Sequence, residues 1–368
     1  MLVIRDKAYI KIEYPICAIA NTDKTLFFDI ETTGFSRKYC NIYLIGCMYF
    51  SGDELMYTQW LAENFNDEAN VLMAFYKFIQ NFDTIIHFNG NAFDIPFVKE
   101  RGEKYKLEFN FDKFKSIDIY KPVSKLNHIL KMENQKQKTF EQILGIKRRD
   151  PFSGGDLIEV FKHFAESKDE RLIFSLLLHN REDIINMGKL ISLLSVSDLF
   201  NNKLFSISKF DFNGYSDING DIQKELRIDL SLNNPIPFSL SYNCRSIHFA
   251  ADKNRAVITV DVIQGTFKYF FNNPKDYYYL PLEDKAIHKS ISAFVDRQFR
   301  KQATASTCYE KFSGDFLPIC NLDNPLFKHT LKEDYKSKTA LIKTDTITDK
   351  TIYAYACEII EFIKHNGK

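Results

Sequence analysis

The chain has 368 residues, of which 45% are hydrophobic and 26% are charged, and its formal net charge is +1. This length allows two domains that each bury a core, and the composition is globular, which excludes a disordered or fibrous chain. A charge of +1 also excludes binding to polyanions through overall charge, so any nucleic-acid binding must depend on local basic patches or on metal ions.

The first 200 residues alternate strand-like and helix-like segments. Short runs of apolar residues predict strands, and apolar residues spaced three and four apart predict helices. We expect strands at 26–31, 42–50, 55–61, 84–88 and 116–119, and helices at 67–82, 93–105, 140–144, 155–165 and 170–195. This alternation indicates an α/β layer fold for a first domain, residues 1–200.

The character of the sequence changes near residues 201–202. β-Branched and aromatic runs, separated by Asn, Gly and Pro, predict strands at 226–232, 256–261, 266–271 and 277–280. Apolar spacing predicts an amphipathic helix over 283–301, with Lys and Arg on its polar face, and a last helix near 349–364. We therefore expect a smaller, strand-rich α+β domain over 203–368. The basic helix face is favoured as the solvated side of a helix packed on a sheet, and the alternative is that it steers a polyanionic substrate to the protein.

Two carboxylates lie at the end of the first predicted strand. Asp29 and Glu31 are two positions apart, and a strand has a period of two, so both side chains point to the same side. Like charges so close together raise each other's pKa unless a cation lies between them. Oxygen ligands at this spacing suit Mg²⁺ or Mn²⁺. The alternative is a strand end exposed to solvent.

A third acid follows the strand at 84–88. Asp94 comes where the chain turns from that strand towards a helix, with Pro96 early in the helix. Open α/β sheets place their sites at the carboxyl ends of strands, so Asp94 is expected beside Asp29. The alternative role is that of a helix N-cap, which does not exclude metal binding.

The long helix at 170–195 carries a fourth acid on its apolar side. His179 and Asp183 lie four residues apart, in a stripe whose other members are Leu172, Leu176, Met187, Leu190 and Leu194. A buried carboxylate needs a partner or a metal ion. The alternative is a structural pair in which His179 satisfies Asp183. The neighbours Arg181 and Glu182 are expected on the solvent side.

Three further features have weaker claims to a function. The basic run 147–149 would either grip phosphates near the site or form an exposed loop. Asp118 more readily organises the turn that follows its strand than joins the site. His87 is expected to be a packed or hydrogen-bonded histidine of its strand.

The acids also lie in recognisable motifs. LFFDIETTG, FNGNAFDIPF and HNRED resemble, in order, the three exonuclease motifs of the DEDD superfamily, and residues 26–194 resemble the bacterial YprB-like ribonuclease-H-like proteins. The matching acids are Asp29, Glu31, Asp94 and Asp183. His179 departs from the family pattern, because it is a histidine at the spacing where Tyr-type members carry a tyrosine.

The resemblance implies a ribonuclease-H-like fold and a metal-dependent 3′-to-5′ exonuclease. In a mechanism with two Mg²⁺ or Mn²⁺ ions, Asp29 would bridge both ions. Glu31 and Asp183 would complete the ion that holds the nucleophilic water, and Asp94 would hold the other ion through water. His179 would orient or deprotonate the nucleophilic water.

The expected partner is therefore nucleic acid, either DNA or RNA, with a free 3′ end. Two alternatives stay open: a catalytically silent module that binds nucleic acid, and a structure-specific endonuclease on the same site. The odd count of seven cysteines, without a CxxC, argues against disulfides and zinc ribbons. With no apolar run long enough for a membrane and no signal-like N-terminus, we expect a cytoplasmic protein. Protein partners and oligomeric state are not indicated.

Overall fold

The structure is a computed structural model, and it describes all residues except 217–219, 221, 245, 320–325, 328 and 366–368. The chain forms two compact units. The N-terminal unit comprises Met1–Asp198 and Ile236–Phe238, and the C-terminal unit comprises Leu199–Pro235 and Ser239–Lys368.

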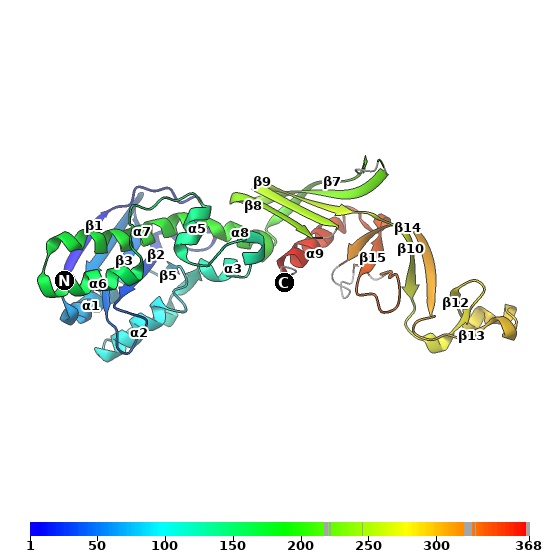
Figure 1. Ribbon diagram of the computed structural model, residues 1–368, viewed down its shortest axis with the longest axis horizontal. Coiled ribbons are helices and arrows are strands. Elements are labelled where there is room, and N and C mark those ends of the chain that lie inside the picture. Colours follow the sequence, from blue (N-terminus) through cyan, green and yellow to red (C-terminus); the bar gives the residue numbers. More distant parts are fainter. Residues whose placement is uncertain (217–219, 221, 245, 320–325, 328, 366–368) are drawn as a thin grey trace. The chain divides into compact units, whose positions relative to one another are not determined.

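A six-stranded mixed sheet is the centre of the N-terminal unit (Figure 1). Its strands are β1 (Leu2–Lys7), β2 (Thr25–Thr32), β3 (Ile42–Ser51), β4 (Glu54–Leu61), β5 (Thr84–His87) and β6 (Lys115–Asp118). They follow the order β1-β4-β3-β2-β5-β6. The β1-β4-β3-β2 part is antiparallel, whereas β2, β5 and β6 run parallel. β2 therefore lies in the middle of the sheet, where its carboxyl end meets that of β5.

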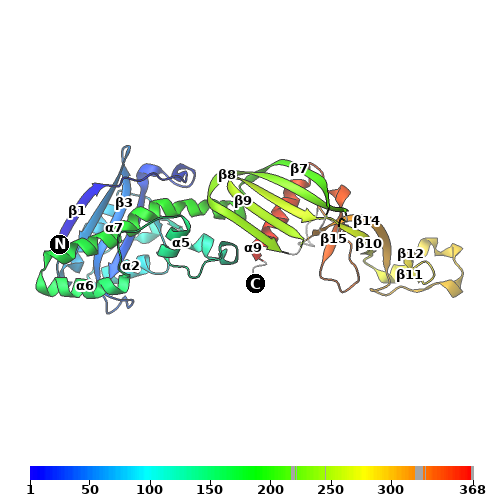
Figure 2. The ribbon, with the colours of Figure 1, turned by 45° about the horizontal axis from the view of Figure 1, so that its top comes forward.

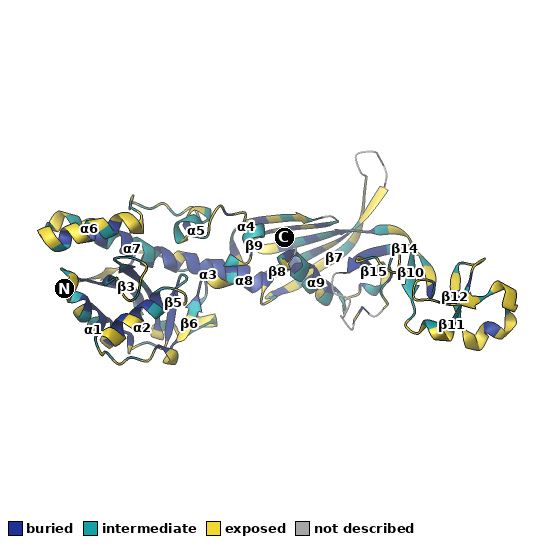
Figure 3. Cartoon of the chain, turned by 60° about the horizontal axis from the view of Figure 1, so that its bottom comes forward, coloured by how far each residue is buried: buried dark blue, intermediate teal, exposed yellow. Residues whose placement is uncertain are grey.

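Helices cover both faces of this sheet (Figure 3). α1 (Glu68–Ile79) and α2 (Asp94–Lys104) lie on one face, and α6 (Gly154–Ser167) and α7 (Ile173–Leu190) lie on the other. Strands that are buried on both faces need apolar side chains throughout, which is why residues 26–28 are all apolar and fully buried. Three short helices, α3 (Tyr120–Ser124), α4 (Asn127–Leu130) and α5 (Gln137–Ile143), connect β6 to α6.

The long helix expected over 170–195 is interrupted near both ends. A 3₁₀ turn at Glu170–Leu172 precedes α7, and another at Ile191–Leu193 separates α7 from α8 (Leu194–Phe200). The Asp169 side chain accepts the amide of Arg171, and the Ser192 hydroxyl donates to the carbonyl of Lys189. Such local side-chain bonds compete with the α-helical pattern, so the apolar stripe continues although the regular helix does not.

A buried ion pair ties the first two helices to the sheet. Arg101 of α2 donates through Nε to Oε1 of Glu68 in α1 at 2.7 Å, and both side chains are 1% exposed. Glu68 Oε1 also accepts the amide of Ile42, at the start of β3, at 2.8 Å. The pair is fully hydrogen-bonded, which is the condition under which buried charges are tolerated.

The C-terminal unit is rich in antiparallel strands. β7 (Phe205–Ser216), β8 (Ile222–Cys244) and β9 (Ile247–Asp261) form one sheet, against which α9 (Ile352–His365) packs (Figure 2). A second sheet has the order β10-β14-β15, with β10 (Ile263–Phe270), β14 (Tyr309–Ile319) and β15 (Ala340–Lys343). A third has the order β12-β11-β13, with β12 (Lys285–His288), β11 (Tyr277–Leu280) and β13 (Lys301–Gln302). The expected strand-rich architecture is confirmed.

The prediction of an amphipathic helix over 283–301 is wrong. This segment contains β12, 3₁₀ turns at Lys289–Phe294 and Arg297–Phe299, and the start of β13. Asp284, at a φ of 50°, turns the chain so that β12 pairs with β11, and its carboxylate accepts the hydroxyl of Tyr279 at 2.5 Å. Phe294 is 93% exposed, so no apolar helix face is buried here. The basic helix face therefore does not exist, although its cationic residues remain.

Two further observations concern the described part of the chain. Six cysteines there are free thiols, and Cys320 lies outside the described residues. Every helix within the described ranges is too short or too polar to cross a lipid bilayer.

Candidate active site

Asp29 and Glu31 occupy the carboxyl half of β2. Asp29 pairs with Gly46 of β3 across the sheet and faces α7. Its Oδ2 accepts a hydrogen bond of 3.0 Å from Nδ2 of Asn180, whose own Oδ1 accepts Nε2 of Gln59 at 3.0 Å. Asn180 is fully buried. A relay of two amide side chains thus fixes the orientation of the Asp29 carboxylate.

Asp94 reaches the same strand from α2. It is the first residue of that helix, and its Oδ1 accepts the amide of Ile30, between Asp29 and Glu31, at 3.2 Å. β2 pairs with β5 only as far as Phe27, so the Ile30 amide on that edge has no strand partner. The N-cap alternative is wrong, because Phe93 holds that position and Asp94 bonds to β2 instead.

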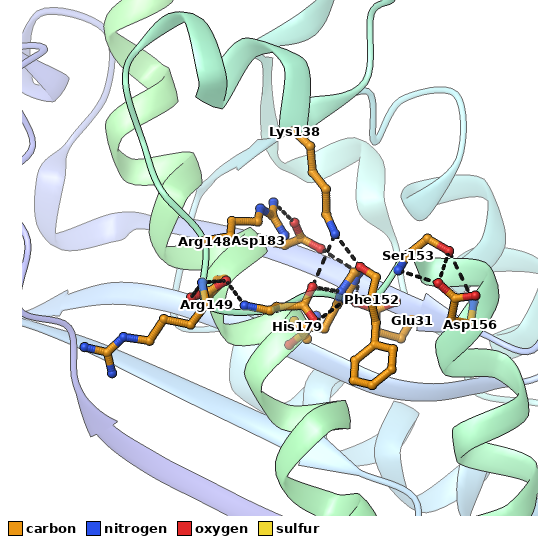
Figure 4. A network of polar contacts seen from close by, with 12 residues as sticks. Glu31, Lys138, Arg148, Arg149, Phe152, Ser153, Asp156, His179 and Asp183 are labelled. Carbon is orange, nitrogen blue, oxygen red and sulfur yellow. Dashed lines mark hydrogen bonds and ion pairs between the residues drawn. The ribbon is translucent and has the colours of Figure 1, made fainter.

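α7 contributes His179 and Asp183, one turn apart (Figure 4). Nε2 of His179 lies 3.3 Å from Oδ2 of Asp183 and 3.9 Å from Oε1 of Glu31. The other ring nitrogen, Nδ1, lies 2.5 Å from Oδ2 of Asp150. α7 packs against β2 and β3, which brings its apolar stripe, and the two polar residues within it, onto the sheet.

The segment before α6 closes over this side of the site. The side chain of Arg148 is 8% exposed, and it is ion-paired with Glu141 of α5 and with Oδ1 of Asp183. Glu182 accepts the amide of Arg149 at 2.9 Å and that of Asp150 at 3.1 Å. The basic run 147–149 was expected either to bind phosphates or to form an exposed loop. Arg148 does neither, because its guanidinium is covered and ion-paired within the protein. Glu182 is partly exposed, and from there it also anchors this segment.

Burial and mutual repulsion dominate the electrostatics. Burial raises the pKa of Asp29 well above its ordinary range, and the charges of Asp183, Asp94 and Glu31 raise it further. The pKa of Glu31 is raised by burial first and then by Asp183 and Asp94. Burial raises the pKa of Asp94 to about 7, although the hydrogen bond from the Ile30 amide opposes the shift. Such a cluster gains stability from bound protons or from a cation.

The residues present fit a divalent cation. Glu31, His179 and Asp183 offer ligand atoms that all lie within 4.8 Å of one another. Among the residues that the structure describes, nothing donates a hydrogen bond to Oε1 of Glu31, although this atom is buried. A buried oxygen that lacks a hydrogen-bond donor and lies beside other acceptors is the arrangement expected around a metal ion.

Asp118 and His87, two further residues considered in the sequence, have structural contacts. Asp118 accepts the amides of Asn89 at 2.9 Å and Tyr120 at 3.0 Å, so it organises the chain after both β5 and β6. His87 is fully buried, with Nε2 2.8 Å from the hydroxyl of Ser116. Both residues have the structural role that the sequence favoured.

Asp150 and Asn180 were missed by the sequence reasoning. Asn180 follows His179 and lies three positions before Asp183, which places it near the same helix face, and this spacing was an available signal. Asp150 lies in a loop 29 positions from His179, directly before Pro151, where an Asp is ordinary turn chemistry. Only the folded chain brings Asp150 to the imidazole.

Comparison with known proteins agrees with this architecture. The family model of the RNase_H superfamily matches residues 26–195. Protein YprB of Bacillus subtilis (strain 168) is 27% identical over 171 residues, which are 45% of this chain and 41% of YprB. The DNA polymerase of Ostreid herpesvirus 1 is 43% identical over 47 residues, which are 12% of this chain and 2% of that polymerase.

Among solved structures, the family B DNA polymerase of the archaeon Pyrobaculum calidifontis matches with a TM-score of 0.36 and 20% identity, over 48% of this chain and 24% of that polymerase. This chain thus spans less than half of the length of each of these relatives. The matched range 26–195 contains the mixed sheet from β2 to β6, the helices on its two faces and all the expected site residues. Residues 26–195 of this chain therefore match the RNase_H superfamily, and this part of the chain has a ribonuclease-H-like fold.

Proposed function

We propose that this protein is a metal-dependent nuclease that hydrolyses phosphodiester bonds of nucleic acid, as a 3′-to-5′ exonuclease. The observation that carries the proposal is the gathering of four acids, Asp29, Glu31, Asp94 and Asp183. Burial, and then the charges of Asp183 and Asp94, raise the pKa of Asp29 and of Glu31, and Oε1 of Glu31 is buried without a donor among the described residues. These acids come from three segments whose motifs resemble those of the DEDD exonucleases. The direction of hydrolysis rests on that resemblance.

The carboxylates have distinct expected roles in holding two Mg²⁺ or Mn²⁺ ions. Asp29 would contact both ions, Glu31 and Asp183 would complete one, and Asp94 would hold the other through water. When bound, the ions would supply an activated water and would stabilise charge on the attacking and leaving oxygens. The water-activating role of His179 stays a prediction from the sequence, and its contacts support a different role.

Neighbouring residues hold these carboxylates in place. Asn180 fixes Oδ2 of Asp29, and the Ile30 amide fixes Oδ1 of Asp94. Arg148 binds Oδ1 of Asp183 and leaves Oδ2 directed at His179. Because these three acids are oriented before a substrate arrives, less reorganisation is needed during the reaction.

Hydrolysis by matched variants tests the proposal. Wild type, Asp29→Asn and the control Asp112→Asn, whose side chain is 82% exposed, are incubated with end-labelled single- and double-stranded DNA and RNA in Mn²⁺ or in EDTA. We expect hydrolysis only with the metal ion, with Asp29→Asn inactive and the control active. Undiminished hydrolysis in EDTA would refute the metal requirement. Binding without hydrolysis on every substrate would favour the silent module, and cleavage of circular substrates would favour the endonuclease.

We propose that residues 203–368 contribute substrate binding and no chemistry. The supporting observation is that Lys285, Arg297 and Lys301 are exposed around β11, β12 and β13 although they form no helix. Neutralising all three with Gln should weaken binding to long oligonucleotides and make it less sensitive to salt, because fewer counterions are released. Unchanged binding across salt concentrations would contradict this role.

A further inference from the structure

His179 is held by a carboxylate on the side away from the acids. Oδ2 of Asp150 lies 2.5 Å from Nδ1, and the Asp150 side chain is fully buried. The same carboxylate accepts the amide of Phe152 at 3.0 Å and Nζ of Lys138 at 3.3 Å. With three donors around it, Asp150 acts as an acceptor, so Nδ1 of His179 carries the proton. Nε2 of a neutral imidazole is then left with its lone pair.

The lone pair on Nε2 faces two carboxylate oxygens. Oδ2 of Asp183 is 3.3 Å away and Oε1 of Glu31 is 3.9 Å away (Figure 4). Oε1 of Glu31 has no donor within the described structure, and its side chain is only 10% exposed. Three acceptors therefore converge on one point. Such an arrangement is unfavourable unless a proton or a cation lies among them, and a divalent cation can contact all three at once.

We propose that Nε2 of His179 is itself a metal ligand, together with Glu31 and Asp183, and that Asp150 is the outer carboxylate that orients it. The site would take a divalent first-row transition ion, such as Mn²⁺, in preference to Mg²⁺. This inference deepens the proposed function, on which it rests for the role of the site. It replaces the water-activating role expected for His179.

The two distances from Nε2 of His179 agree with coordination of each pair to one ion. Two ligands that are each about 2.1 Å from the same ion lie at most about 4.2 Å apart. The separations of 3.3 and 3.9 Å from Nε2 fall below that limit. Arg148 occupies Oδ1 of Asp183, so Oδ2 is the oxygen left for the ion. Metal-bound histidines usually donate their other ring N–H to a carboxylate, which is the place of Asp150 here.

Two other roles for His179 explain less of the site. An imidazolium paired with Asp183 would use its Nε2 proton at 3.3 Å and would leave the buried Oε1 of Glu31 without a partner. A general base needs its lone pair directed at a water, whereas Nε2 is directed at two ligand oxygens. An imidazole ligand also predicts the choice of ion, because Mg²⁺ prefers oxygen ligands and first-row transition ions accept nitrogen readily.

Pulsed electron paramagnetic resonance of bound Mn²⁺ tests the proposal directly. The full chain is freed of metal with EDTA and given one equivalent of Mn²⁺. We expect a ¹⁴N coupling from a directly bound imidazole, lost in His179→Gln and kept in His163→Gln, whose histidine is exposed on α6. Mn²⁺ affinity should fall about 10–100-fold in Asp150→Asn, as for other outer-sphere partners. Mg²⁺ should displace Mn²⁺ only in large excess.

Bound Mn²⁺ with oxygen ligands alone in the wild type would overturn the proposal, and so would displacement by an equal concentration of Mg²⁺. The wild-type spectrum decides even if His179→Gln fails to fold. Failure of the proposed function looks different: a ¹⁴N-coupled ion without hydrolysis of any nucleic acid would keep this inference and refute the nuclease. Hydrolysis by a protein whose Mn²⁺ has only oxygen ligands would keep the nuclease and refute the His179 ligand.

Discussion

Gly46 of β3 lies in close contact with side chains of α7, and Gly46→Ala tests that packing. A methyl group at this position would lie 2.0 Å from Cδ1 of Ile184 and 2.1 Å from Oδ1 of Asn180. Both separations are far below the roughly 3.5 Å at which carbon contacts become favourable. Since these neighbours belong to α7, either both side chains must move or the helix must shift.

The cost follows from these contacts. Overpacking a core by one methyl group costs about 1–3 kcal/mol. At about 2–4 °C per kcal/mol for a unit of this size, the melting temperature should fall by about 2–12 °C. Displacing Asn180 would also remove its 3.0 Å bond to Asp29, so metal affinity should fall with stability.

Thermal unfolding of matched variants provides the measurement. Gly154→Ala is the control, because a methyl group there meets no atom within 4 Å, and its stability should change by less than about 0.5 kcal/mol. Ile184→Val removes the Cδ1 atom, so combining it with Gly46→Ala should cost less than the sum of the two single changes. If Gly46→Ala melts with the wild type, α7 does not pack on β3 as described and the reasoning is refuted.

Three further predictions concern other parts of the molecule. Arg101→Met leaves the buried carboxylate of Glu68 without its cation, so the free energy of unfolding, measured with urea, should fall by about 3–5 kcal/mol; a loss below 1 kcal/mol would contradict the burial of this pair. Mn²⁺ should raise the melting temperature of the wild type more than that of Asp29→Asn, because only binding to the native state stabilises it; equal shifts would place the ion elsewhere. For Glu361, burial raises the pKa, but hydrogen bonds from Lys203 and other neighbours outweigh it and hold the pKa at about 2, below the ordinary 4.5. A carboxyl group with a depressed pKa stabilises the folded chain above pH 4.5, and this stability is lost as the pH falls towards 2. In Glu361→Gln, the free energy of unfolding should therefore depend less on pH in this window, by under about 1 kcal/mol because the group is partly exposed. An unchanged acid profile would argue against the pair with Lys203.

Much of the N-terminal unit could be predicted because its signals are local. The period of a strand places Asp29 and Glu31 on one side, and the apolar stripe of a helix places His179 and Asp183 against the core. Both inferences depend only on neighbours in sequence. The family model then confirms the fold class for residues 26–195.

The rest depends on contacts between distant segments. Arg148 meets Asp183 across 35 positions and Asp150 meets His179 across 29, so neither pairing leaves a periodic pattern in the sequence. Periodicity was also misleading over 283–301, where a turn at Asp284 and pairing with β11 outweigh an amphipathic spacing. Strand pairing between segments is a tertiary effect that overrides local helix signals.

Anomalous X-ray scattering from crystals soaked in Mn²⁺ tests the central claim most directly. An anomalous peak should lie within about 2.0–2.3 Å of carboxylate oxygens of Asp29, Glu31 and Asp183. Nε2 of His179 should lie at the same distance from that peak if it is a ligand. Carboxylates that stay together without any peak, at Mn²⁺ concentrations that support hydrolysis, would contradict the claim that these acids form the metal centre of a nuclease.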